Sequence, residues 1–108
     1  MRLEEIVEEI VGDSSSGAAQ LTIKAANLYL KLLENKPSLR LVRKLTKMLV
    51  SARPSMPSIA NMAYRIEKQI SEDLSKGVRL EEAIENSVRM NVSEYQDSLR
   101  RDVQNAAE

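Results

Sequence analysis

The sequence contains neither cysteine nor histidine. Their absence excludes disulfide bonds, thiol nucleophiles, imidazole acid–base catalysis and the soft-metal sites that these two residue types build. Carboxylates alone can hold a hard cation, but the sequence contains no motif for such a site. We therefore expect no metal site, no cofactor and no catalytic residue in this chain.

Aromatic residues are also scarce, since the chain has three tyrosines, no phenylalanine and no tryptophan. Proteins that bind single-stranded nucleic acids stack bases on aromatic side chains, and this sequence offers almost none. Lysine and arginine together number 16, and so do aspartate and glutamate, so the net charge is zero. Duplex-binding proteins usually carry a basic excess. The composition predicts that the partner is not a nucleic acid.

Long apolar runs are missing as well. The second residue is already charged, and the longest uncharged stretch falls well short of the roughly 20 residues that a membrane span needs. From these two features we expect no signal peptide, no membrane partner and a cytoplasmic location.

What the sequence does contain is helical periodicity within a length of 108 residues, typical of one domain. The pattern predicts a first helix over 3–11 and a second that begins after Ser16, its N-cap, and ends at the break at 35–38. A third helix is predicted from that break to Ala52, a fourth from Pro57 to Gly77, and a fifth from Leu80 onward. The second helix has the widest apolar surface, so we expect it at the centre. No stretch alternates long enough for a strand. The predicted fold class is all-α, a small bundle of about five helices with a long C-terminal helix.

An unbroken apolar row runs through the last helix with spacings of four and three residues: Ile84, Val88, Val92, Tyr95, Leu99, Val103 and Ala106. About 27 residues at 1.5 Å each make a rod of about 40 Å, which is longer than a domain of this size is wide. We expect Val92, Tyr95, Leu99 and Val103 to extend past the bundle and to form an interface. A following domain or a second copy of the chain would cover this row.

Two turns are candidate anion sites. In the first, Arg53 is followed by proline, and Ser55 and the open N–H groups of the next helix lie close in sequence. A guanidinium and a helix N-terminus both suit a phosphate or a carboxylate. The alternative is ordinary helix punctuation, with Arg53 at a helix end, Ser55 as a cap and Pro57 in the first turn. As a surface residue of a turn, Arg53 is expected to contribute little to stability.

The second candidate turn is Ser16-Gly17-Ala18. Small residues at a helix start let a ligand approach the backbone, and Gly17 has no side chain to obstruct it. Serine-rich helix caps are also common, and the full glycine-rich phosphate motifs are missing. Both interpretations therefore stay open for this turn.

The order of these features resembles the N-terminal helical domain of the translation initiation factor 2B alpha/beta/delta family. The resemblance is carried by the Ser-Ser-Gly-Ala-Ala turn, the segment SARPSMPSIANMAYRI at 51–66, and a long last helix with Leu99-Arg100-Arg101. It covers the chain from about Leu3 onward, and its most specific element is the Arg53-Pro54-Ser55 turn with Asn61. The family includes regulatory subunits of a guanine-nucleotide exchange factor, their archaeal-type relatives, and isomerases of methylthioribose 1-phosphate and ribose 1,5-bisphosphate.

The resemblance implies a larger parent protein. In that family a Rossmann-like domain follows the helical domain and carries the isomerases' catalytic Cys and Asp, so 1–108 is expected to be the N-terminal part of a longer two-domain protein. The isomerases hold substrate phosphate with an Arg-Gly-Ala turn. Here Ser16 replaces that arginine, whereas Gly17 and Ala18 match and Arg53 matches a second phosphate-side arginine. The departure at Ser16 favours the non-catalytic initiation-factor branch.

The leading hypothesis is thus a regulatory or interaction domain of an initiation factor 2B-related protein, acting in protein biosynthesis and non-catalytic alone. One alternative is the N-terminal, substrate-side domain of a sugar-phosphate isomerase, and another is a free-standing helical adaptor without a ligand. The implied partners are related subunits or the protein's own C-terminal domain, with a homodimer through the last helix as a further option. Weak binding of phosphate, a sugar phosphate or a nucleotide is expected at Arg53.

Overall fold

The computed structural model describes residues 3–13, 15–34 and 36–107, with side chains as far as Arg100. This part of the chain forms α1 (Leu3–Val11), α2 (Ala18–Lys31), a short 3-10 helix η1 (Leu32–Glu34), α3 (Leu39–Ala52), α4 (Pro57–Ser75) and α5 (Leu80–Ala107). It contains no strand. The predicted all-α bundle of five helices with a long last helix is confirmed. None of the described helices is long and apolar enough to cross a bilayer.

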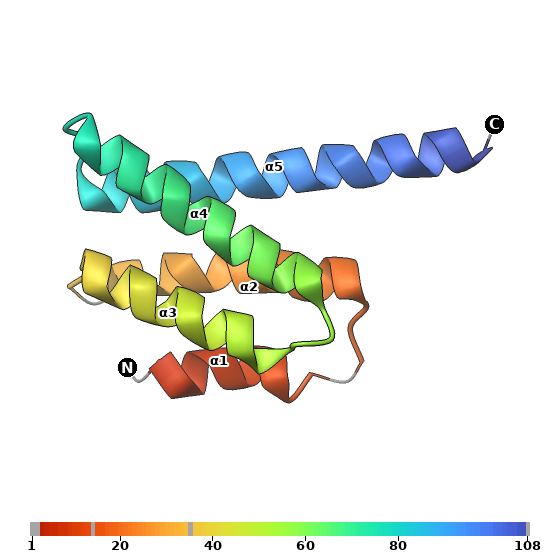
Figure 1. Cartoon of the computed structure of the whole chain (residues 1–108), viewed down its shortest axis with the longest axis horizontal. Helices are drawn as coiled ribbons and strands as arrows, with labels where there is room; N and C mark the ends of the chain where they lie inside the picture. The colour runs from red at the N-terminus through yellow and green to blue at the C-terminus, as the bar shows by residue number, and fades with distance from the viewer. Residues whose placement is uncertain (1–2, 14, 35, 108) are drawn as a thin grey trace.

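Helix α2 lies at the centre of the bundle and packs against α1, α3, α4 and α5. The central position expected from its broad apolar surface is confirmed. Helix α4 crosses diagonally in front of α2 and α5, and α5 continues past the end of every other helix (Figure 1). The 28 residues of α5 correspond to about 42 Å, close to the molecule's longest extent of 46 Å.

Local sequence signals explain several helix boundaries. Ser38 is the N-cap of α3, and its hydroxyl accepts a hydrogen bond from the Leu41 N–H at 3.2 Å. Pro57 occupies the first turn of α4, where its missing N–H has no intrahelical partner to lose. Gly77 ends α4 with a φ of 89°, a left-handed conformation that glycine adopts without strain.

Two capping predictions are wrong. The N-cap of α2 is Gly17, and the Ser16 hydroxyl instead donates to the carboxylate of Asp13 at 2.7 Å. The N-cap of α4 is Met56, so the exposed Ser55 does not cap that helix. In both cases the capping residue lies one position later than the serine that the sequence favours.

The hydrophobic core draws on all five helices. Its largest fully buried side chains are Tyr29, Ile10, Leu21, Leu28, Leu45, Leu49, Ile59, Ile66, Ile70 and Ile84. The apolar rows expected on each helix supply most of this cluster. Leu30 is an exception, because 37% of it is exposed on the α5 side of α2.

The core also contains polar side chains that periodicity does not reveal. Tyr29 is fully buried, and its hydroxyl lies 2.6 Å from Oγ1 of Thr46. The Thr46 hydroxyl also lies 3.1 Å from the carbonyl of Val42, and the Tyr29 hydroxyl lies 3.5 Å from that of Ala63. Burial raises the pKa of Tyr29, which stays neutral. This chain of hydrogen bonds joins α2 to α3.

A second buried polar pair joins α5 to α4. The Ser87 hydroxyl donates to the carbonyl of Ile66 at 2.9 Å, and the Asn91 amide donates to the carbonyl of Ser87 at 2.7 Å. Among the described residues, every buried side-chain nitrogen and oxygen has a hydrogen-bond partner. Since an unpaired polar group in the core is costly, these bonds restrict how α4 and α5 can pack.

The Tyr29–Thr46 bond yields a prediction on stability. Thr46→Val leaves the Tyr29 hydroxyl with only a long contact of 3.5 Å to the carbonyl of Ala63. We expect this variant to lose about 1–3 kcal/mol, because a buried donor loses its partner. Tyr29→Phe leaves Thr46 bonded to Val42 and should lose about 0.5–1.5 kcal/mol.

Urea unfolding of both single variants and the double variant provides the measurement. The double variant should lose less stability than the sum of the two single losses, because removing both partners leaves no unpaired hydroxyl. Strictly additive losses would show that the two hydroxyls are not coupled.

Candidate functional site

The first candidate anion residue, Arg53, is half-buried and holds the end of α1. Its Nε donates to the carbonyl of Ile10 at 3.2 Å, and its Nη2 donates to the carbonyls of Val11, at 3.4 Å, and of Asp13. The last carbonyls of a helix have no intrahelical partner, so the guanidinium supplies one. The expectation that Arg53 lies on the surface of the turn is therefore wrong, and the size of its contribution to stability stays a prediction.

The turn before α2 has an anion of its own, the carboxylate of Asp13. Oδ1 accepts from the N–H groups of Ser15 and Ser16 at 3.0 and 2.9 Å, and Oδ2 accepts from the Ser16 hydroxyl and from Nζ of Lys24. Only 9% of this side chain is exposed. The bonds from Ser16, and then the one from Lys24, hold the pKa of Asp13 well below its usual range.

The two candidate anion turns lie side by side. Arg53 contacts the carbonyl of Asp13, and the hydroxyls of Thr22 and Ser58 are 2.8 Å apart, which joins the second turn of α2 to the first turn of α4. Gly17, Ala18 and Ser55 are exposed nearby. Anion binding there stays a prediction, which a phosphate titration followed by amide NMR at these three residues would test.

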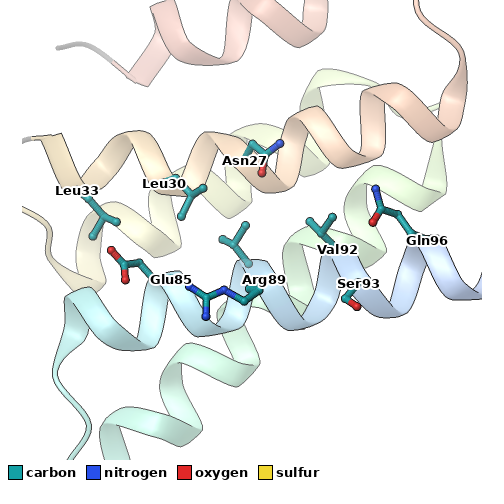
Figure 2. A pocket seen from close by; sticks show the side chains of 9 residues that line it. Asn27, Leu30, Leu33, Glu85, Arg89, Val92, Ser93 and Gln96 are labelled. Atoms are coloured by element: carbon teal, nitrogen blue, oxygen red, sulfur yellow. The ribbon is translucent and has the colours of Figure 1, made fainter.

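A groove of about 690 Å³ runs between α2 and α5. Its apolar floor consists of Leu30 and Leu33 on one side and Val88 and Val92 on the other. Leu30 and Leu33 point toward α5, and Val92 points toward α2 (Figure 2). The polar side chains that complete the lining are Asn27, Glu85, Arg89, Ser93 and Gln96. The groove is thus apolar in its depth and polar at its rim.

The predicted interface row on α5 begins in this groove and continues along the helix. Val92 and Tyr95 are half-buried and pack against the core, and Leu99 is half-buried farther along. The side chain of Val103 lies outside the described residues. Beyond the groove, α5 extends past the bundle (Figure 1). The interface role of all four residues stays a prediction.

Sequence reasoning did not find the groove itself. The apolar row through Val88 and Val92 was visible, and so was the surplus apolar width of the second helix that includes Leu30. Both could have indicated an incompletely covered seam. The missing information was that η1 brings Leu33 alongside α5, which depends on how the chain turns after Lys31.

The titratable groups with shifted pKa values have structural positions. Asp13 is bonded within a turn and Tyr29 lies inside the core. Among the described residues, no three carboxylates come close enough together to hold a metal ion. The α2–α5 groove has a chemistry that suits an apolar contact with polar edges.

No protein-family model matches the chain, and neither a curated protein nor a solved structure matches it significantly. The resemblance to the initiation factor 2B family therefore stays a prediction based on the turns and the long last helix.

We predict that Arg53→Ala lowers the free energy of unfolding by about 1–3 kcal/mol, because three carbonyl oxygens lose a charged donor. Urea unfolding measures the loss. Arg79→Ala is the matched control, since 83% of that side chain is exposed and its removal should change stability by less than about 0.5 kcal/mol. Equal losses in the two variants would show that the Arg53 bonds contribute little.

A second prediction concerns pH. Folding lowers the pKa of Asp13 below its ordinary value of 3.8. At pH values above 3.8 the charged carboxylate therefore stabilises the folded state. The stabilisation is lost as the pH falls through the lower, folded value. In Asp13→Asn the acceptor for the two N–H groups remains, but the charge facing Lys24 is gone.

Between about pH 7 and about pH 3 the parent chain should therefore lose more stability than Asp13→Asn. Urea midpoints at both pH values give the comparison, and the other carboxylates contribute equally to both proteins. Parallel losses would contradict the role assigned to Asp13.

Proposed function

We propose that the chain is a regulatory or interaction domain of a cytoplasmic initiation factor 2B-related protein, and that it binds a protein partner through α5. On this proposal it is the N-terminal helical part of a two-domain protein and is not catalytic alone. The observation that carries the proposal is the apolar groove between α2 and α5, whose lining includes Val92, with the half-buried Leu99 two turns farther along the same helix.

The composition of this face supports a protein partner. Leu30, Val92 and Leu99 offer apolar area that a partner helix can cover, and grooves between helices are a common mode of helix recognition. Tyr95, which lines the neighbouring hollow between α4 and α5, is a half-buried aromatic side chain of the type that contributes strongly at interface centres. The polar rim would stay in contact with water and would set the register of the partner.

The isomerase alternative has less support. It needs Arg53 to meet a substrate phosphate, whereas Nε and Nη2 of Arg53 donate to backbone carbonyls. It also needs Ser16 to replace an arginine, and the Ser16 hydroxyl donates to Asp13. We therefore place the initiation-factor branch first, with a related regulatory subunit or a second copy as the partner.

Analytical ultracentrifugation of the chain, alone and mixed with an initiation factor 2B regulatory subunit, tests the proposal. We expect a dimer or a mixed complex that Tyr95→Glu weakens at least ten-fold, because a charge in a desolvated contact is unfavourable. Met90→Glu is the control, because Met90 is exposed on a different face of the same helix.

A strict monomer that also fails to bind the regulatory subunit would overturn the proposal. Equal weakening by the two glutamate variants would remove Tyr95 from the interface. Turnover of ribose 1,5-bisphosphate or methylthioribose 1-phosphate by the chain would contradict a non-catalytic role.

A further inference from the structure

Helix α3 carries a face of positive charge. Its 14 residues include Arg40, Arg43, Lys44 and Lys47 and contain no acidic residue. All four side chains are exposed. Their spacing of three and four residues places them on one side of the helix, over an axial distance of about 10 Å. A chain with zero net charge thus has a locally basic surface.

These four cations, which we call the α3 cations, lack counter-ions among the described residues. The ion pairs found there join Lys24 to Asp13, Lys31 to Glu9, Arg79 to Glu81 and Arg100 to Asp97. Like charges three or four residues apart repel one another along a helix. An anionic partner would relieve this repulsion, so the surface favours an acidic ligand.

The α3 cations border a groove of about 570 Å³ between α3 and α4. Tyr64, with 55% of its surface exposed, and Val50 give the groove an apolar part. Glu67 of α4, Thr46 and Ser51 complete the lining. The surface therefore combines an apolar strip with a row of cations, and it lies on different helix pairs from the α2–α5 groove.

We propose that the α3–α4 groove binds an acidic amphipathic helix of a partner protein. Carboxylates spaced three and four residues apart on such a helix would meet the α3 cations over two turns, with Arg40 and Arg43 able to bind carboxylates through two parallel hydrogen bonds. The apolar side of the helix would cover Val50 and Tyr64. A helix of about 10 Å diameter suits a groove between two helices.

A nucleic acid fits this surface less well. Tyr64 is the single aromatic side chain of the lining, whereas proteins that bind single strands stack successive bases on several. The absence of a net positive charge also removes the long-range attraction on which polyanion binding depends. The α3 cations are spaced for the carboxylates of a helix.

The test uses the full chain and a fluorescein-labelled amphipathic peptide of about 15 residues, or about four helical turns, with glutamates on one face and leucines on the adjoining face. Fluorescence anisotropy measures its affinity. We expect Arg43→Glu/Lys47→Glu to weaken binding at least ten-fold. The same exchange at the exposed turn between α4 and α5, Lys76→Glu/Arg79→Glu, changes the net charge equally and should leave the affinity within two-fold.

Four further measurements complete the test. A peptide with glutamine in place of glutamate should bind at least ten-fold more weakly, and raised salt should weaken the glutamate peptide, because the contacts are exposed charges. Tyr95→Glu should leave the peptide affinity unchanged, which separates this surface from the α5 interface. Circular dichroism confirms that each variant is folded.

Three results would reject the proposal, and a fourth would assign the surface to another class of partner. No binding of the glutamate peptide, equal loss in the two double variants, or equal binding of the glutamine peptide would each reject an acidic helix as the occupant. Tighter binding of a polyuridine RNA than of the peptide would assign the surface to a nucleic acid instead.

Discussion

The Arg53 guanidinium links the two turns that lead into α2 and α4, the helices that border both candidate grooves. Arg53 follows α3, and the carbonyls that it holds end α1 and begin the turn into α2. One side chain thus fixes the α1–α2 turn against the α3–α4 turn. Helices α2 and α4 then meet near their N-termini at the Thr22–Ser58 bond, and these two helices border the two grooves on which the proposals rest.

Charge in this protein is distributed by helix, which the zero net charge conceals. Helix α1 presents exposed glutamates, among them Glu4, Glu5 and Glu8, whereas α3 presents only cations. The two helices pack against each other through apolar faces, so their charged faces turn outward. A neutral protein can therefore have a strong local field, which acts on a partner at short range even though the net charge gives no long-range attraction.

The sequence predicted what depends on neighbours in the chain. The apolar rows, the Ser38 cap, the left-handed Gly77 and the length of α5 all follow from residues within a few positions. The sequence-based prediction failed where the two residues of a contact lie far apart in the chain. Arg53 and Asp13 are 40 residues apart, and Tyr29 and Thr46 are 17 residues apart. No local rule indicates that a turn arginine will find carbonyls on another helix or that a tyrosine will find a hydroxyl in the core.

The same distinction explains why the candidate surfaces lie on helix faces. A helix N-terminus or a turn arginine attracts an anion only while its donors are unsatisfied. Before α2, the carboxylate of Asp13 accepts from the N–H groups of Ser15 and Ser16, and at the end of α1 backbone carbonyls accept from Nε and Nη2 of Arg53. These donors are satisfied within the chain, whereas the first N–H groups of α2 and α4 have no side-chain cap. Among the described residues, the apolar area at Leu30 and the cations of α3, which form no ion pair there, are further groups that another molecule can contact.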